Sequence, residues 1–280
     1  MKPRFVGRLG VADAVTTFNA VLGFLAVAAA TAAPGLAARA VLLAGIADGL
    51  DGVLARRYGS SKAGPYLDSL ADVASFAVAP AVLVFAVVRE AWDVTVALSP
   101  AAATPRTALA VGVPALFVAA AVVRLGLYTA YDVEDEATEG AQSTLAATVL
   151  GAAVLSGYTG PTFLLAVTGA FVYLMLAPIR YPDLLARDAF LMGVVHFLAV
   201  LFPRALDRSF PVALLILGLA YMLLSPWLYW RDGFPTLGSS DGDGGESAFT
   251  EDDDAVEGTD GPAEDDGGGD GASADGKGNA

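Results

Sequence analysis

The chain has 280 residues, 55% of them hydrophobic, and a mean hydropathy of +0.59, which excludes an ordinary water-soluble domain and is typical of a multi-span membrane protein. Its formal net charge is −14, but 14 of the 30 acidic residues and only one of the 16 basic residues lie at or after Asp241. The acidity therefore belongs to the tail, while the absence of cysteine excludes disulfides and thiolate metal sites.

The apolar segments, taken in order, predict a helical membrane protein. Residues 1–12 carry Lys2, Arg4 and Arg8 among apolar residues, which indicates a short interfacial helix at the headgroup surface. A helix of about 20 apolar residues crosses a hydrocarbon core of ~30 Å. We therefore expect an all-α polytopic transmembrane bundle of about 6–8 spans, with eight candidates at about 14–33, 38–56, 68–88, 108–130, 143–158, 161–178, 189–203 and 210–230.

Composition divides the chain near residue 232. Residues 1–232 are predicted to form the membrane-embedded domain, and the Gly-, Asp-, Glu- and Ser-rich residues 233–280 a disordered tail. Basic residues cluster at the N-terminus and in the connector at 56–62, which indicates that both lie on the cytoplasmic side of the cell membrane. Arg180 and Arg187 agree with this topology, whereas Arg204 and Arg208 do not.

Carboxylates recur at helical spacing across the second and third candidate spans. At about 100° per residue, Asp48, Asp51, Gly52 and Ala55 share one face of a helix. Three further residues share one face of the next helix, Gly64, Asp68 and Asp72. The short polar connector lets the two helices lie antiparallel, so that the two carboxylate pairs face each other.

Four converging carboxylates in a dry site are costly unless a divalent cation neutralises them. Oxygen donors of this kind suit Mg²⁺ or Mn²⁺, and two ions would clamp the attacking and leaving oxygens of a phosphoryl transfer. Gly52 and Ala55 would let a nucleotide approach the backbone, and the planar guanidinium of Arg56 would hold a diphosphate.

At these residues the chain resembles the CDP-alcohol phosphotransferases, whose signature is D-x-x-D-G-x-x-A-R, a spacer, and G-x-x-x-D-x-x-x-D. Every defined position is present, from Asp48 to Asp72. The resemblance implies a CDP-lipid donor, an alcohol acceptor, CMP as leaving group, Asp72 as general base, and a homodimer. It also implies that Thr16 and Asn19 line the nucleotide pocket and that Ser61 contacts the donor.

The run from Asp68 to Pro80, D-S-L-A-D-V-A-S-F-A-V-A-P, resembles the phosphatidylserine synthase branch of that family. The branch's Arg-Leu-x-x-(Phe/Tyr) element is matched from Arg124 to Tyr128. Its Gly-x-Pro-(Ser/Thr) element has Gln142 in place of proline. The resemblance implies L-serine as acceptor, and a CDP-archaeol donor with archaetidylserine as product if the host is a salt-adapted archaeon. We expect partners to be these substrates and membrane lipids, with no nucleic acid.

Alternatives remain at five points. The acceptor of the same chemistry could be glycerol 3-phosphate or inositol phosphate, and a divalent cation transporter would also place carboxylates inside a membrane. Arg124 either contacts a carboxylate or phosphate or extends toward the interface. Thr16 and Asn19 either line the nucleotide pocket, as the resemblance implies, or bond to neighbouring helices with Asp13 as the helix N-cap. His196 is either a proton relay or ligand, or an interior polar residue bonded to a neighbouring helix, which is the interpretation we favour.

Overall fold

The computed structural model describes residues 7, 9–95, 104–132, 137–182 and 186–228. The predicted interfacial helix at residues 1–12 lies largely outside these residues. The predicted tail at 233–280, with its boundary near 232, lies wholly outside them. Both therefore stay predictions.

Every predicted span coincides with a helical segment. The helices are α1 (Val11–Ala29), α2 (Pro34–Tyr58), α3 (Gly64–Asp72), α4 (Ala79–Trp92), α5 (Pro105–Leu127), α6 (Ser143–Ser156), α7 (Pro161–Leu176), α8 (Ala186–Leu201) and α9 (Ser209–Leu228). A π-helical segment, Val73–Val78, joins α3 to α4, so the third predicted span is one continuous rod. The all-α fold class is confirmed.

Length and composition identify four described segments that can cross a membrane, and no membrane is present. They are Val11–Ala29, Gly64–Trp92, Pro105–Ala130 and Ala205–Leu224. Helix α2 is 25 residues long but carries charges near both ends and in its second half, while α6 and α7 are apolar but shorter. The predicted count of 6–8 spans therefore needs some of α2, α6, α7 and α8 in addition to these four segments.

Helix α6 lies at the centre of the bundle, against α2, α7 and α9. All of its residues from Leu145 to Leu155 are buried, which fits a helix that is apolar on every side. Small residues allow the close approach: a β-carbon at Gly151 would lie 3.3 Å from the Leu42 side chain of α2. His196 of α8 lies beside Gly45 of α2 and hydrogen-bonds to the Leu42 backbone. This agrees with the interpretation of His196 as an interior polar residue bonded to another helix.

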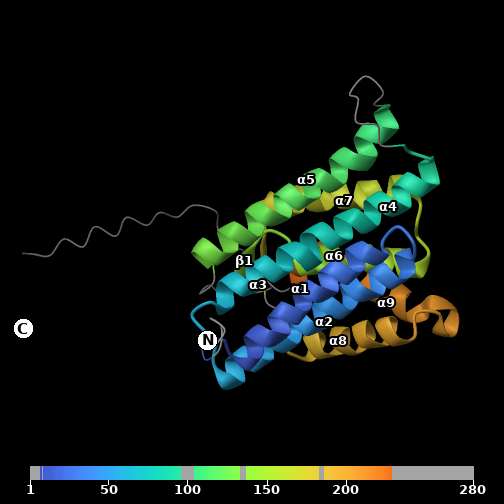
Figure 1. Ribbon diagram of the computed structural model, residues 1–280. Helices are drawn as coiled ribbons and strands as arrows, with labels where there is room; N and C mark the ends of the chain where they lie inside the picture. The colour runs from blue at the N-terminus through green and yellow to red at the C-terminus, as the bar shows by residue number, and fades with distance from the viewer. Residues whose placement is uncertain (1–6, 8, 96–103, 133–136, 183–185, 229–280) are drawn as a thin grey trace, which may run out of the picture. The chain divides into compact units, whose positions relative to one another are not determined.

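Helix α1 packs against α2, α3 and the π-helical segment, and this contact brings the sequence motif together. In Figure 1 the start of α1, the end of α2, the start of α3 and the end of α5 lie at the same end of the bundle. The α1–α2 turn, the end of α4 and the α8–α9 connection lie at the opposite end. The first of these ends carries the aspartates, and we call it the aspartate end.

A two-stranded antiparallel ribbon was not predicted. Strand β1 (Ala137–Glu139) pairs with β2 (Arg180–Pro182), so that Thr138 faces Tyr181 in the ladder. Gly140 follows β1 with a φ of +78°, and a β-carbon there would collide with the Met175 carbonyl oxygen. The ribbon joins the α5–α6 connection to the α7–α8 connection, and it was missed because two three-residue strands leave no period in the sequence.

Gly23 of α1 offers a test of this packing. A β-carbon there would lie 2.8 Å from both the carbonyl carbon of Ala74 and Oγ of Ser75, atoms of the π-helical segment. We expect Gly23→Ala to destabilise the protein by about 1–3 kcal/mol through overpacking. The measurement is the thermal unfolding midpoint in detergent.

The control is Gly112→Ala in α5, because a β-carbon at Gly112 meets no atom within 4 Å. That change should raise the midpoint slightly, since alanine favours a helix over glycine by roughly 0.5–1 kcal/mol. Equal shifts in both variants would contradict the close contact at Gly23.

Candidate active site

Three carboxylates meet where α2 and α3 face each other. Ligand oxygens of Asp48, Asp68 and Asp72 all lie within 4.8 Å of one another. Asp72 is buried and the other two are half-buried. The predicted convergence of these aspartates across two helices is therefore present in the structure.

The fourth aspartate, Asp51, lies one turn further along α2 and is held by α1. Its Oδ2 accepts a hydrogen bond of 2.6 Å from Thr16 Oγ1, and both side chains are buried. Asp51 remains close enough to Asp68 for their charges to interact. The motif thus divides into a cluster of three and a neighbouring carboxylate oriented by Thr16.

Asn19 of α1 contacts the buried member of the cluster. Its Nδ2 donates to Asp72 Oδ1 at 3.4 Å, and its backbone carbonyl accepts a 2.8 Å bond from Ser75 Oγ. Thr16 and Asn19 therefore bond to neighbouring helices, as predicted. Within the described part of the chain, the buried Oδ1 of Asn19 has no hydrogen-bond partner.

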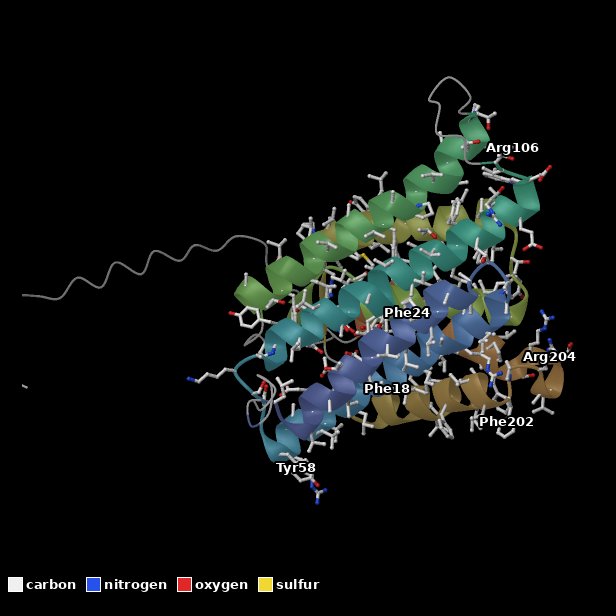
Figure 2. All side chains as sticks on the ribbon, in the orientation of Figure 1. Phe18, Phe24, Tyr58, Arg106, Phe202 and Arg204 are labelled. Carbon is white, nitrogen blue, oxygen red and sulfur yellow. The ribbon has the colours of Figure 1, made fainter. Side chains whose placement is uncertain are left out.

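A cavity of about 200 Å³ opens beside these residues. Thr16, Asp51, Gly52, Ala55, Gly64 and Asp68 line it, and all of them were predicted site residues. The lining also includes residues that the sequence did not single out, among them Ala12, Asp13, Ser60, Ser69, Tyr128 and Thr129. Figure 2 labels Tyr58, the last residue of α2, at the aspartate end of the bundle.

One wall of this cavity comes from the π-helical segment that follows α5, Tyr128–Asp132. The Thr129 hydroxyl hydrogen-bonds to the Ser69 hydroxyl of α3. Arg124 is buried one turn earlier, where its guanidinium lies 5.8 Å from the Tyr128 ring centroid and interacts electrostatically with Asp72. Arg124 therefore faces the interior, as expected for an arginine that contacts a carboxylate.

Six predicted site residues do not line this cavity: the buried or half-buried Asn19, Asp48, Asp72 and Arg124 behind it, and Arg56 and Ser61. Arg56 is exposed on α2, and a β-carbon at Gly52 would lie 3.5 Å from its Nη1. Ser61 stays in the connector turn, where its hydroxyl accepts a bond from the Ala63 amide, and the neighbouring Ser60 lines the cavity instead. The assignments of Arg56 and Ser61 to the donor stay predictions.

The N-cap interpretation of Asp13 is wrong. Helix α1 begins after Gly10, and Asp13 lies one turn inside it, with its Oδ2 accepting the Gly10 amide at 2.6 Å. The carboxylate is buried, and its Oδ1 would lie 3.4 Å from a β-carbon at Gly64. The signal that was available is the spacing of Asp13, Thr16 and Asn19, which places all three on the face of α1 that meets the motif.

The cluster fits a divalent cation. Like charges held this close inside a bundle raise the free energy of the folded protein unless an ion of opposite charge offsets them. Asp48, Asp68 and Asp72 would hold the ion, and carboxylate oxygens suit Mg²⁺ or Mn²⁺. Thr144 of α6 lies within hydrogen-bonding reach of Asp48 and orients that ligand from the second layer.

Residues 9–202 match the family model of the CDP-alcohol phosphatidyltransferases, and the chain belongs to that family. Members transfer a phosphatidyl group from a CDP-alcohol to an acceptor, which makes this a membrane transferase of phospholipid biosynthesis. The family usually uses divalent metals, in agreement with the aspartate cluster. The chain has no match among curated proteins. The homodimer and the cytoplasmic orientation of the site stay predictions.

Replacing one ligand tests the metal assignment directly. We expect Asp68→Asn to weaken Mn²⁺ binding by at least roughly 10–100-fold, because a neutral amide replaces a charged ligand. Electron paramagnetic resonance of purified protein titrated with Mn²⁺ measures this loss without turnover. Glu90→Gln, at an exposed position near the end of α4, is the control and should bind Mn²⁺ normally. Normal Mn²⁺ binding by Asp68→Asn would contradict the assignment.

Proposed function

We propose that the protein transfers a phosphatidyl or archaetidyl group from a CDP-lipid to the hydroxyl of L-serine and releases CMP. One observation carries this proposal: three elements that resemble the phosphatidylserine synthase branch meet at the aspartates. Ser69, next to Asp68, hydrogen-bonds to Thr129, which follows the Arg124–Tyr128 element. Thr144, from the third element, lies beside Asp48.

The donor fits the open side of the cavity. Gly52 and Ala55 present little side chain to a nucleotide that approaches α2, and Asp13 and Thr16 supply polar groups on α1. A bound divalent cation would neutralise the diphosphate and stabilise the charge that develops during transfer. Arg56, whose Nη1 lies beside Gly52, would hold a diphosphate oxygen.

Asp72 is the general base of this proposal. Asn19 engages one of its oxygens, which fixes the rotation of the carboxylate, and Arg124 supplies a nearby positive charge. The acceptor oxygen forms a bond to the phosphorus that carries the lipid, and the bond from that phosphorus to the CMP oxygen breaks. CMP leaves with the electron pair, and Asp72 takes the hydroxyl proton.

Serine is favoured as acceptor by the resemblance and by the size of the remaining space. Ser69, Tyr128 and Thr129 form a small polar wall on the side opposite α1, suited to the amino and carboxylate groups of a small acceptor. Glycerol 3-phosphate or inositol phosphate is the second candidate, because Arg124 offers a phosphate-binding guanidinium near the same wall. Family membership favours both over a cation transporter.

An acceptor comparison tests the substrate. We expect purified enzyme, given a CDP-lipid and Mg²⁺ or Mn²⁺, to release CMP with L-serine and not with glycerol 3-phosphate or inositol phosphate. The measurement is CMP by chromatography together with the mass of the lipid product. Release with another acceptor would keep the site and discard serine. No metal-dependent release with any acceptor would contradict the transferase assignment at this site.

Removing the base should separate binding from chemistry. Asp72→Asn is expected to lower the rate of CMP release by about 10²–10⁴-fold, because the proton of the acceptor loses its carrier. Donor binding, measured by calorimetry with the CDP-lipid in the absence of acceptor, should change far less. Asp93→Asn, at an exposed position after α4, is the control for a lost charge. Equal losses of donor binding and rate would contradict the base role.

A further inference from the structure

A second polar cavity, of about 680 Å³, lies at the end of the bundle opposite the aspartates. Its walls are the first turns of α2, the end of α6, the end of α8 and the turn that leads to α9. Figure 2 labels Phe202 and Arg204 there, far along the bundle from Tyr58 at the aspartate end. The cavity shares no residue with the candidate active site.

Three arginines, Arg39, Arg204 and Arg208, line this cavity. Arg39 is half-buried, and its Nε donates a 2.8 Å hydrogen bond to the Val200 carbonyl, which fixes the guanidinium and leaves its two terminal nitrogens for a ligand. Arg208 lies against Gly157, where any β-carbon would collide with its Nη1. The site is therefore shaped around two of its guanidinium groups.

The backbone adds to the same positive field. Gly35 and Leu36 line the cavity in the first turn of α2, a helix of 25 residues with no acidic side chain in that turn. The amides of Leu36 and Ala37 already donate to the Ala33 carbonyl. The Gly35 amide is therefore the donor of this turn that can favour an anion. A β-carbon at Gly35 would meet no atom within 4 Å, so a ligand can reach the backbone there. In the described segments, no carboxylate forms a salt bridge with the three arginines; Asp207 is the nearest acid in sequence and is exposed.

Apolar side chains surround the arginines on the outside. Leu36, Leu201 and Phe202 line the cavity, and each exposes about half of its side-chain surface, 56%, 45% and 53% respectively. Guanidinium groups beside exposed leucine and phenylalanine match the headgroup and upper acyl chain of a lipid, because the cation meets the phosphate while the apolar side chains meet the hydrocarbon. A soluble anion would gain nothing from these apolar side chains.

We propose that this cavity binds the phosphate headgroup of an anionic phospholipid in the membrane leaflet opposite the aspartates. Arg39 and Arg204 hold the phosphate oxygens by charge-assisted hydrogen bonds, and the acyl chains run along Leu201 and Phe202. The basic residues at the N-terminus and at 56–62 predict positive charge at the aspartate end, and Arg204 and Arg208 depart from that prediction. An anionic lipid in this cavity would account for their charge. The proposal does not depend on the transferase chemistry.

Lipid binding to the purified full chain tests the proposal. Native mass spectrometry in neutral detergent would compare phosphatidylglycerol, phosphatidylcholine and inorganic phosphate as ligands. We expect phosphatidylglycerol to bind most tightly, and Arg204→Gln and Arg39→Gln each to weaken it by about tenfold or more. Arg106→Gln removes one positive charge at the same end of the bundle but outside the cavity, and should leave binding unchanged.

Three results would overturn the proposal. The first is equal binding of phosphatidylglycerol and phosphatidylcholine, and the second is an equal loss in Arg106→Gln. The third is binding of inorganic phosphate as tight as that of the lipid, which would assign the cavity to a soluble anion. Arg204 is exposed, so Arg204→Gln keeps the fold, and unfolding midpoints identify any variant whose loss of binding is a loss of structure.

Discussion

The structure depends on carboxylates that converge inside an apolar bundle. Ligand oxygens of Asp48, Asp68 and Asp72 lie within 4.8 Å of one another in a bundle that is largely apolar. Their mutual repulsion and lost hydration raise the free energy of the folded chain, and a bound cation would offset both costs. The surrounding helices act as a frame that keeps these groups together.

Helix α1 is the main part of that frame. Its face carries Asp13, Thr16 and Asn19, which reach α2 and α3, and one turn later Gly23 lets the π-helical segment approach to contact distance. A larger residue at Gly23 would push away the rod that carries Asp68 and Asp72. The packing at Gly23 and the positions of Asp68 and Asp72 are therefore linked, because both depend on where the rod from α3 to α4 lies.

The sequence predicted the spans and the aspartate cluster because both rest on periodicity. Apolar runs locate helices, and an i, i+4 repeat places Asp68 and Asp72 on one face whatever the tertiary context. It did not predict that Ser60 rather than Ser61 lines the cavity, because the register of an irregular connector is decided by tertiary contacts. Thr129 and Thr144 were out of reach for the same reason: they join the site from the π-helical segment after α5 and from α6, through packing that no local pattern records.

Helix α2 contributes to two groups of like charge, one positive and one negative. Near its N-terminus it contributes Arg39 to a cavity with two further arginines, and nine residues later, roughly 14 Å along the axis, it contributes Asp48 to the acidic cluster. Arg56 and Arg57 in its last turn already match the negative end of the helix, so the aspartates do not compensate for the helix dipole. Like charges gathered in each group are costly alone, and a ligand of opposite charge would remove that cost. By the two proposals, α2 would contribute to an anion site near its N-terminus and to a cation site in its second half.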